Sequence, residues 1–181
     1  VDGEFVPIGL NEEFAEIVGT AVSAKANISR PVGDGIRLDM LQLEGAKFGI
    51  NASGDQSGLE GRIRLDPLAT KTVSTGGGEG EFEVSLPGEA IGAALDLELT
   101  SFSWQNQHFS EPRLSVDLRQ NDAVDINANL MATFNESPLN LVANGAWTDD
   151  SLVFPDIRLS AHQFNASATI DVPVSNLAAA K

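Results

Sequence analysis

Few residues of this chain have the chemistry of a catalytic or metal-binding group. Only two histidines are present, His108 in WQNQHFS and His162 in LSAHQFN, and each lies in or beside a predicted turn. Neither has a second histidine or a glutamate at the spacing of a zinc site, so we expect both to be exposed surface residues. The absence of cysteine excludes disulfides, thiolate metal ligands and a cysteine nucleophile.

Carboxylates are abundant, but their positions indicate structural roles. Asp55 and Asp149 lie in turn segments, where aspartate accepts local hydrogen bonds, whereas Glu81 and Glu83 alternate with apolar residues on a predicted strand. No two carboxylates stand out as the acid and base of a glycosidase. The Gly-rich segment 75–80 lacks the lysine of a phosphate-binding loop. We therefore predict no catalytic residue, no cofactor and no metal site, and we expect that the chain is not an enzyme.

The charge balance restricts the partners of the chain. Its 26 acidic and 11 basic residues give a formal net charge of −15, which repels nucleic acid and anionic lipid headgroups. No stretch reaches the roughly 18 consecutive apolar residues of a transmembrane helix. The chain begins with Val1 rather than Met, so we expect residues 1–181 to be a single domain that belongs to a longer protein.

Alternating apolar and polar residues dominate the chain, and they predict an all-β fold. Turn signals rich in Gly, Pro, Asp and Ser separate about ten such segments, the longest of which is 124–134. Residues 10–19 differ, because Leu10, Phe14 and Ile17 have helical spacing, and a short helix near 11–18 is predicted there. We expect an elongated, curled sheet, mostly antiparallel, with one apolar and one polar face.

Two parts of the chain repeat one another. A shift of 116 residues maps LQLEGAKFGINASG, residues 41–54, onto IRLSAHQFNASATI, residues 157–170, and a shift of 117 aligns 22–26 with 139–143. The extra residue falls in a turn, where changes of length are tolerated. Segments 22–54 and 139–170 are therefore predicted to be two copies of one three-stranded meander, as in folds built by stacking similar units.

Many apolar positions of the predicted strands hold alanine, among them Ala24, Ala26 and Ala128. A close-packed sandwich core usually needs larger side chains, so these residues predict an apolar groove with room for a tight curl or for a guest molecule. The aromatic segment 102–109 either closes the sheet as an ordinary strand or forms the rim of this groove. The residues predicted to line the groove are Val22, Ala24, Ala26, Leu41, Leu43, Phe48, Ile50, Phe82, Val84, Leu95, Leu97, Leu114, Val116, Val124, Ile126, Ala128, Leu130, Leu139, Leu141, Ile157, Leu159, Phe164, Ala166 and Ala168.

Residues 16–66 carry a degenerate pattern of glycines and apolar residues. A Gly-x-apolar strand and a turn precede I-x-L-x-x-L-x-L-x-G, which leads to a strand ending in Ala-Ser-Gly and a further strand with glycine near its start. The matching positions are Gly19, Val22, Ile36, Leu38, Leu41, Leu43, Gly45, Ala52, Ser53, Gly54 and Gly61. This pattern resembles the recurring unit of the TamB (translocation and assembly module) and AsmA-like family. The second copy departs from it, with Ala161 where the first has Gly45.

The resemblance implies a segment of a periplasmic protein of Gram-negative bacteria, anchored in the inner membrane by another part of its chain. It implies a non-enzymatic role in phospholipid transport between the membranes and in protein secretion and outer-membrane protein assembly. The implied partners are lipid acyl chains, adjacent repeats of the same parent chain and an outer-membrane barrel bound through another region. An apolar groove needs no polar motif, because each buried methylene contributes about 0.8 kcal/mol.

Two other functions are compatible with the same residues. A sealed β-sandwich, serving as a structural or adhesin-like module without a lipid groove, would bury its apolar faces against each other. A carbohydrate-active or hydrolase domain would need clustered carboxylates in a cleft of sugar size, and it is the least favoured of the three alternatives.

Overall fold

The computed structural model describes residues 2–5, 19, 21–31, 35–70, 72–86, 91–120, 122–148, 150–162 and 164–173. Every regular element within these residues is a β-strand, so the predicted all-β class is confirmed. The helix predicted near 11–18 lies outside the described residues.

The described residues form more strands than the sequence predicted. The strands are β1 (Asp2–Phe5), β2 (Val22–Ser29), β3 (Arg37–Glu44), β4 (Phe48–Asp55), β5 (Gly58–Leu65), β6 (Leu68–Ala69), β7 (Val73–Thr75), β8 (Gly78–Ser85), β9 (Ile91–Leu99), β10 (Ser101–Trp104), β11 (Gln107–Gln120), β12 (Val124–Phe134), β13 (Ser137–Trp147), β14 (Ser151–Ala161) and β15 (Phe164–Pro173). About ten were expected from alternation. Of the others, β1, β6, β7 and β10 have two to four residues, too few for alternation to be visible.

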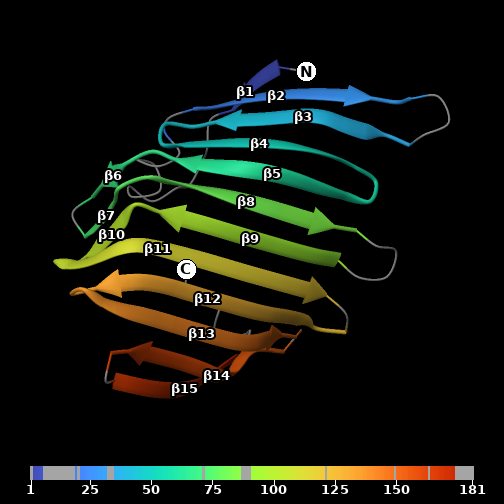
Figure 1. Ribbon diagram of the computed structural model, residues 1–181. Coiled ribbons are helices and arrows are strands. Elements are labelled where there is room, and N and C mark those ends of the chain that lie inside the picture. Colours follow the sequence, from blue (N-terminus) through green and yellow to red (C-terminus); the bar gives the residue numbers. More distant parts are fainter. Residues whose placement is uncertain are drawn as a thin grey trace.

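All fifteen strands belong to one antiparallel sheet that does not close (Figure 1). The main path runs β1-β2-β3-β4-β5-β8-β9-β11-β12-β13-β14-β15, so nearly every strand pairs with its neighbours in sequence. Strands β6, β7 and β10 form a branch, in which β10 pairs with both β7 and the first residues of β11. Tight turns make this meander, and Gln105 and Asn106 adopt the positive φ angles typical of two-residue hairpins.

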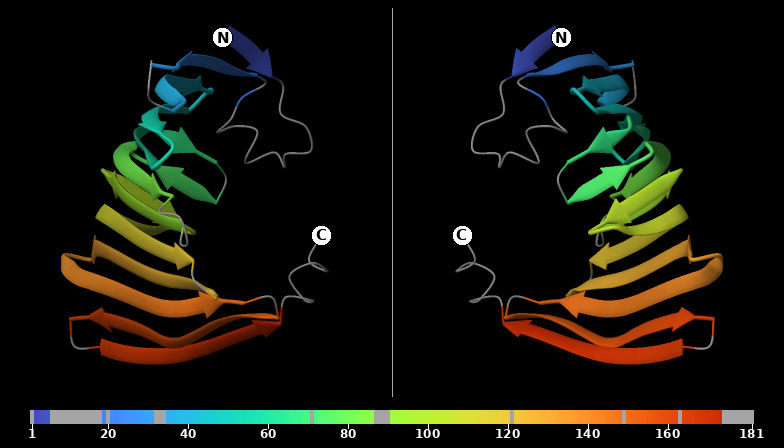
Figure 2. Two further views of the ribbon diagram at one scale, coloured as in Figure 1. Left: turned by 90° about the vertical axis from the view of Figure 1, so that its right-hand side faces the viewer. Right: turned by 90° about the vertical axis from the view of Figure 1, so that its left-hand side faces the viewer.

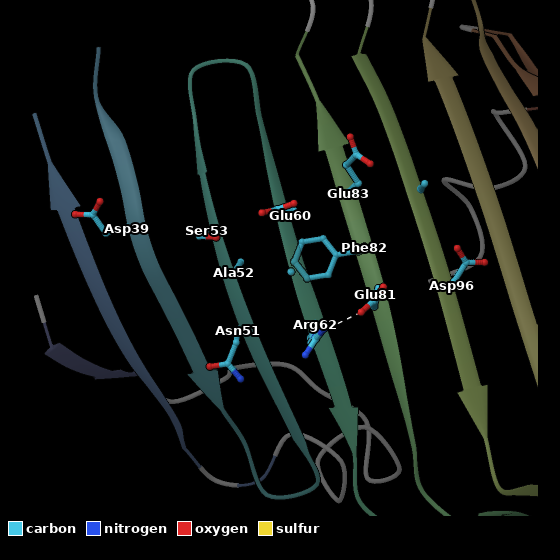
Figure 3. Close-up of a pocket in the computed structure, with 12 residues that line it drawn as sticks. Asp39, Asn51, Ala52, Ser53, Glu60, Arg62, Glu81, Phe82, Glu83 and Asp96 are labelled. Carbon is cyan, nitrogen blue, oxygen red and sulfur yellow. Dashed lines mark hydrogen bonds and ion pairs between the residues drawn. The ribbon is translucent and has the colours of Figure 1, made fainter. Parts of the chain in front are cut away.

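The sheet curls into an arc, with β2 near one end and β15 at the other (Figure 2). Pairing across strands shows which residues share a face. One row joins Ala52, Gly61, Phe82 and Leu95, and the next row joins Asn51, Arg62, Glu81 and Asp96. The polar row lies on the convex side, which faces the viewer in Figure 3, so the apolar row faces the hollow of the arc.

The predicted repeat is confirmed by the register of the strands. Leu41 pairs with Ala52 in the first copy, and Ile157 pairs with Ala168 in the second, which is the same pair shifted by 116 residues. Strands β13, β14 and β15 therefore repeat β2, β3 and β4.

The irregularities of the two copies also coincide. The β3–β4 ladder shifts register between Leu38 and Leu41, and the β14–β15 ladder shifts between Phe154 and Ile157. A β-bulge is a specific departure from regular strand pairing, and alternation of residues does not reveal it. The two copies are therefore equivalent in their bulges as well as in their sequence pattern.

Large side chains on the apolar face lie over glycines of the neighbouring strand. Gly61 pairs with Phe82, and a methyl group on Gly61 would come within 2.6 Å of the Phe82 ring and would also meet the Asn51 carbonyl oxygen. Leu97 lies over Gly80 in a similar way. This lateral packing gives the apolar side chains contacts without a second layer of structure.

Replacing Gly61 with alanine should destabilise the sheet, because the added methyl meets backbone as well as the Phe82 ring. Overpacking of this kind costs about 1–3 kcal/mol, measurable as the free energy of unfolding in urea. Gly92→Ala is the matched control, since a methyl there closely meets only the Ser85 hydroxyl, which can rotate. Equal losses in the two variants would contradict this account of the packing.

The turn between β4 and β5 is fixed by Asp55. Its Oδ1 accepts hydrogen bonds from Ser57 Oγ at 2.6 Å and from the Ser57 backbone N–H at 2.8 Å. These bonds, the hydroxyl first, hold the pKa of Asp55 below its ordinary value of 3.8. A carboxylate with a lowered pKa stabilises the fold above its unfolded-state pKa, and this contribution is lost as the pH falls through the folded-state value.

Ser57→Ala should therefore raise the pKa of Asp55 toward 3.8, as followed by NMR titration of its carboxyl carbon. The variant should be less stable than the parent at neutral pH, and the difference should shrink on acidification because Asp55 then becomes protonated in both proteins. Ser53→Ala, on the adjoining part of β4, should leave the pKa of Asp55 unchanged. A stability difference that persists at low pH would show that the hydroxyl acts in some other way.

Candidate apolar binding face

The structure brings all the predicted groove residues onto one face of the sheet. Register pairs connect them in continuous rows, one of which passes from Ala24 through Leu43 and Ile50, and another from Leu97 through Leu114 and Leu130. We call this the apolar face, and it runs from β2 to β15. The face also includes residues that the sequence analysis left out, namely Leu38, Ala52, Leu59, Ile63, Leu65, Ala93, Leu99, Leu118, Ala132, Phe134, Ala143 and Phe154.

Strand β5 is the main contribution that sequence reasoning missed. Leu59, Ile63 and Leu65 alternate with charged residues in GLEGRIRL, so the signal was present. Gly61 occupies the remaining inward-facing position, between Leu59 and Ile63. This glycine interrupts the apolar alternation, although the Phe82 ring packs over it.

The apolar face has no covering layer in the part of the chain that the structure describes. Only Val22, Ala52 and Ala132 are buried hydrophobic residues, with 2%, 7% and 9% of their surface exposed. The other members are half-buried or exposed, and no large side chain among the described residues is fully buried. A folded chain of this size usually seals a core, so an extended, half-exposed apolar surface marks a place for a partner or ligand.

Aromatic side chains gather at one end of the apolar face. The rings of Phe102 and Phe109 lie 6.0 Å apart, and those of Phe109 and Phe134 lie 5.1 Å apart and stacked. Trp104, on the same hairpin, pairs with Val73 of the branch and is 51% exposed. Segment 102–109 is thus a hairpin flanking the end of the apolar face rather than a strand that closes the sheet.

The polar face carries charged residues in cross-strand pairs. Arg62 Nε lies 3.1 Å from Glu81 Oε1, and Arg64 Nη2 lies 3.2 Å from Glu44 Oε2. Such exposed pairs each contribute about 0–1 kcal/mol. They keep this face hydrated, and the apolar face is therefore the one available for apolar ligands.

A hollow of about 580 Å³ lies on the polar face (Figure 3). Its lining includes Arg62 and the carboxylates Asp39, Glu60, Glu81, Glu83 and Asp96. Ala52, Gly61 and Phe82 of the apolar row also border it, but the charged and polar residues of its lining belong to the polar face. Within the described residues, no group of three or more His, Asp or Glu side chains is placed to hold a metal ion.

Both histidines are exposed, as predicted. His108 Nδ1 lies 2.9 Å from Ser103 Oγ across the β10–β11 hairpin. None of the described segments is a helix with the length and apolar character needed to cross a membrane.

No family model, curated protein or solved structure matches the chain. The motif positions of the TamB-like pattern nevertheless have defined places in the sheet. Ala52 is buried on the apolar face, Gly54 pairs with Leu38 next to a bulge, and Gly61 lies beneath Phe82. Each of these residues has a structural reason to be small.

The openness of the apolar face can be measured with single thiols, because the chain has no cysteine of its own. Ala128→Cys places a thiol on the apolar face and Asn127→Cys places one on the polar face of the same strand, β12. In lipid-free folded protein, both thiols should react with a small water-soluble maleimide at rates within about tenfold of each other. A thiol at position 128 that reacts only in denaturant would show that the face is sealed.

Proposed function

We propose that this chain is a non-enzymatic segment of a periplasmic conduit between the inner and outer membranes, and that its apolar face holds phospholipid acyl chains. The observation that carries the proposal is the apolar face itself, which is continuous from β2 to β15 over eleven paired strands and, within the described residues, is exposed or half-exposed at most of its positions. The TamB-like pattern of residues 16–66 supports the assignment to the TamB and AsmA-like family, with its roles in lipid transport, protein secretion and outer-membrane protein assembly.

The dimensions of the face suit an acyl chain. Strands of eight residues, such as β4, span about 26 Å at roughly 3.3 Å per residue. An acyl chain fills about 15 Å, half the hydrocarbon thickness of a bilayer. One chain lying along the strands, with its headgroup at the rim, therefore fits within the width of the sheet.

The energetics also favour an unspecific apolar site. A chain of a dozen methylenes gains up to about 10 kcal/mol on complete burial, at about 0.8 kcal/mol each. Loss of translational and rotational freedom offsets at least about 4 kcal/mol of this gain. An open face buries only part of the chain, so binding is weak at each place and the lipid can move from one place to the next.

A sealed sandwich has less support. That fold requires a second sheet packed about 10 Å from the first. The described strands all belong to one sheet, and nearly all of their apolar residues keep some exposed surface.

Substitution of the apolar face tests the proposal. Ile126→Asp and Leu130→Asp place a charge in the middle of the face, on strand β12, so the amount of lipid recovered with the purified protein should fall at least about tenfold. Native mass spectrometry and displacement of a fluorescent fatty acid measure this loss. Circular dichroism and urea unfolding show whether the variants remain folded.

Asn127→Asp is the matched control, since it adds the same charge one residue away on the polar face. It should retain lipid, and because it faces Asp117 of β11 it should lose at most about 1 kcal/mol of stability. Parent protein that carries no lipid and does not bind the fatty acid would refute the proposal, and so would equal binding by the Ile126→Asp and Asn127→Asp variants. Unfolding of the apolar-face variants alone would favour a sealed core.

A further inference from the structure

Strand β15 ends the sheet with an unusually accessible edge. Within the part of the chain that the structure describes it pairs with β14 alone, and residues 164–171 are all exposed. Natural sheets block such edges with charged residues, proline or bulges, because unpaired backbone groups attract other strands. Residues 164–170, FNASATI, contain neither charge nor proline. This edge is open to strand pairing.

The first copy of the repeat shows what occupies the equivalent edge. Strand β5 covers β4 over eight residue pairs, from Phe48 with Leu65 to Asp55 with Gly58. Ala52, opposite Gly61 of β5, is 7% exposed. Its equivalent Ala168 has the same partner on β14 but is exposed.

The aromatic residues at the start of the two strands differ in the same way. Phe48 is half-buried beside Leu65, whereas Phe164 is 58% exposed. The two copies share sequence, register and bulge, so the exposed surface of β15 corresponds to the absence of one strand.

Among the described residues no strand follows β15 in the way that β5 follows β4. In the first copy, Asp55 begins the turn that leads to β5. In the second copy the equivalent Asp171 lies inside β15, and Val172 and Pro173 continue the ladder by pairing with Leu152 and Ser151. A hairpin equivalent to β4–β5 is therefore absent at this position.

We infer that the edge of β15 accepts an extended strand in trans, antiparallel to β15 and with the residue pattern of β5. In the register of the first copy, glycine of this strand would lie opposite Ala168, with isoleucine opposite Ala166 and leucine opposite Phe164. Its charged residues would lie on the polar face, beside the uncharged residues Asn165, Ser167 and Thr169. The equivalent residues of β4, namely Gly49, Asn51 and Ser53, are uncharged too and lie beside the charged residues of β5. This inference goes beyond lipid binding and does not depend on it.

A peptide of residues 57–66, SGLEGRIRLD, acetylated and amidated at its ends, tests this inference against the intact chain. Hydrogen exchange followed by mass spectrometry should show that amides of residues 164–173 exchange about tenfold more slowly at saturating peptide. The protection should be confined to β15. In the first copy the even-numbered residues of β5 direct their backbone groups to β4, so a peptide with Arg62→Pro lacks an N–H on the pairing edge and should give no protection.

Two variants of the chain separate edge pairing from unspecific adhesion. Ala168→Glu places a charge opposite the glycine on the apolar face and should abolish peptide binding, whereas Ser167→Glu places the same charge opposite the arginine and should retain it. Both positions are exposed, so neither variant should lose the fold, which circular dichroism checks.

The inference would be overturned by protection at the β1–β2 edge in place of β15, or by equal binding of the proline peptide. It would also be overturned if a second copy of the chain protected β15 and the peptide failed to displace that copy. Peptide protection of β15 measured on the Ile126→Asp protein keeps the two proposals apart, because Ile126 lies on the apolar face of β12, away from the β15 edge. Parent protein that carries no lipid but still binds the peptide at β15 would refute only the proposed function.

Discussion

Backbone hydrogen bonding between neighbouring strands is the interaction on which this structure depends. In the described part of the chain no second layer packs on the sheet, and only three hydrophobic residues are buried. Each strand is therefore held by the two strands beside it and by side chains that lean sideways over them. Stability of this kind is a sum over neighbouring pairs of strands, as in other stacked-repeat folds.

This dependence explains why small residues occupy the apolar face. Where a sandwich brings large side chains from two sheets together, a single sheet gains close contacts where a large residue of one strand packs over a small residue of the next. The Phe82 ring over Gly61 and Leu97 over Gly80 are examples. Within the described residues, the face that results keeps much of its apolar surface exposed.

The alternation of residues predicted the sheet, its two faces and the repeated meander. Each strand has one polar and one apolar side, and successive side chains point to opposite sides. Short strands such as β6 and β10 could not be predicted, since two to four residues carry no period. Strand β5 was left out of the predicted lining because Gly61 interrupts its alternation, although the glycine is required there by the neighbouring ring. The bulges and the exposed edge of β15 follow from the pairing of the strands and carry no sequence pattern of their own, so they are visible only in the folded chain.

The bulges that recur in the two copies have a consequence for longer assemblies. A bulge bends its strand and increases the local twist, and here the same bulge stands at the same register in each copy. The two copies therefore bend their strands at equivalent places, and units of this kind placed in series would add similar increments of rotation. Closure into a barrel needs strand tilt and stagger to match a fixed strand number. Units in series with a constant increment instead coil into a trough of uniform pitch, whose length can grow without changing its cross-section.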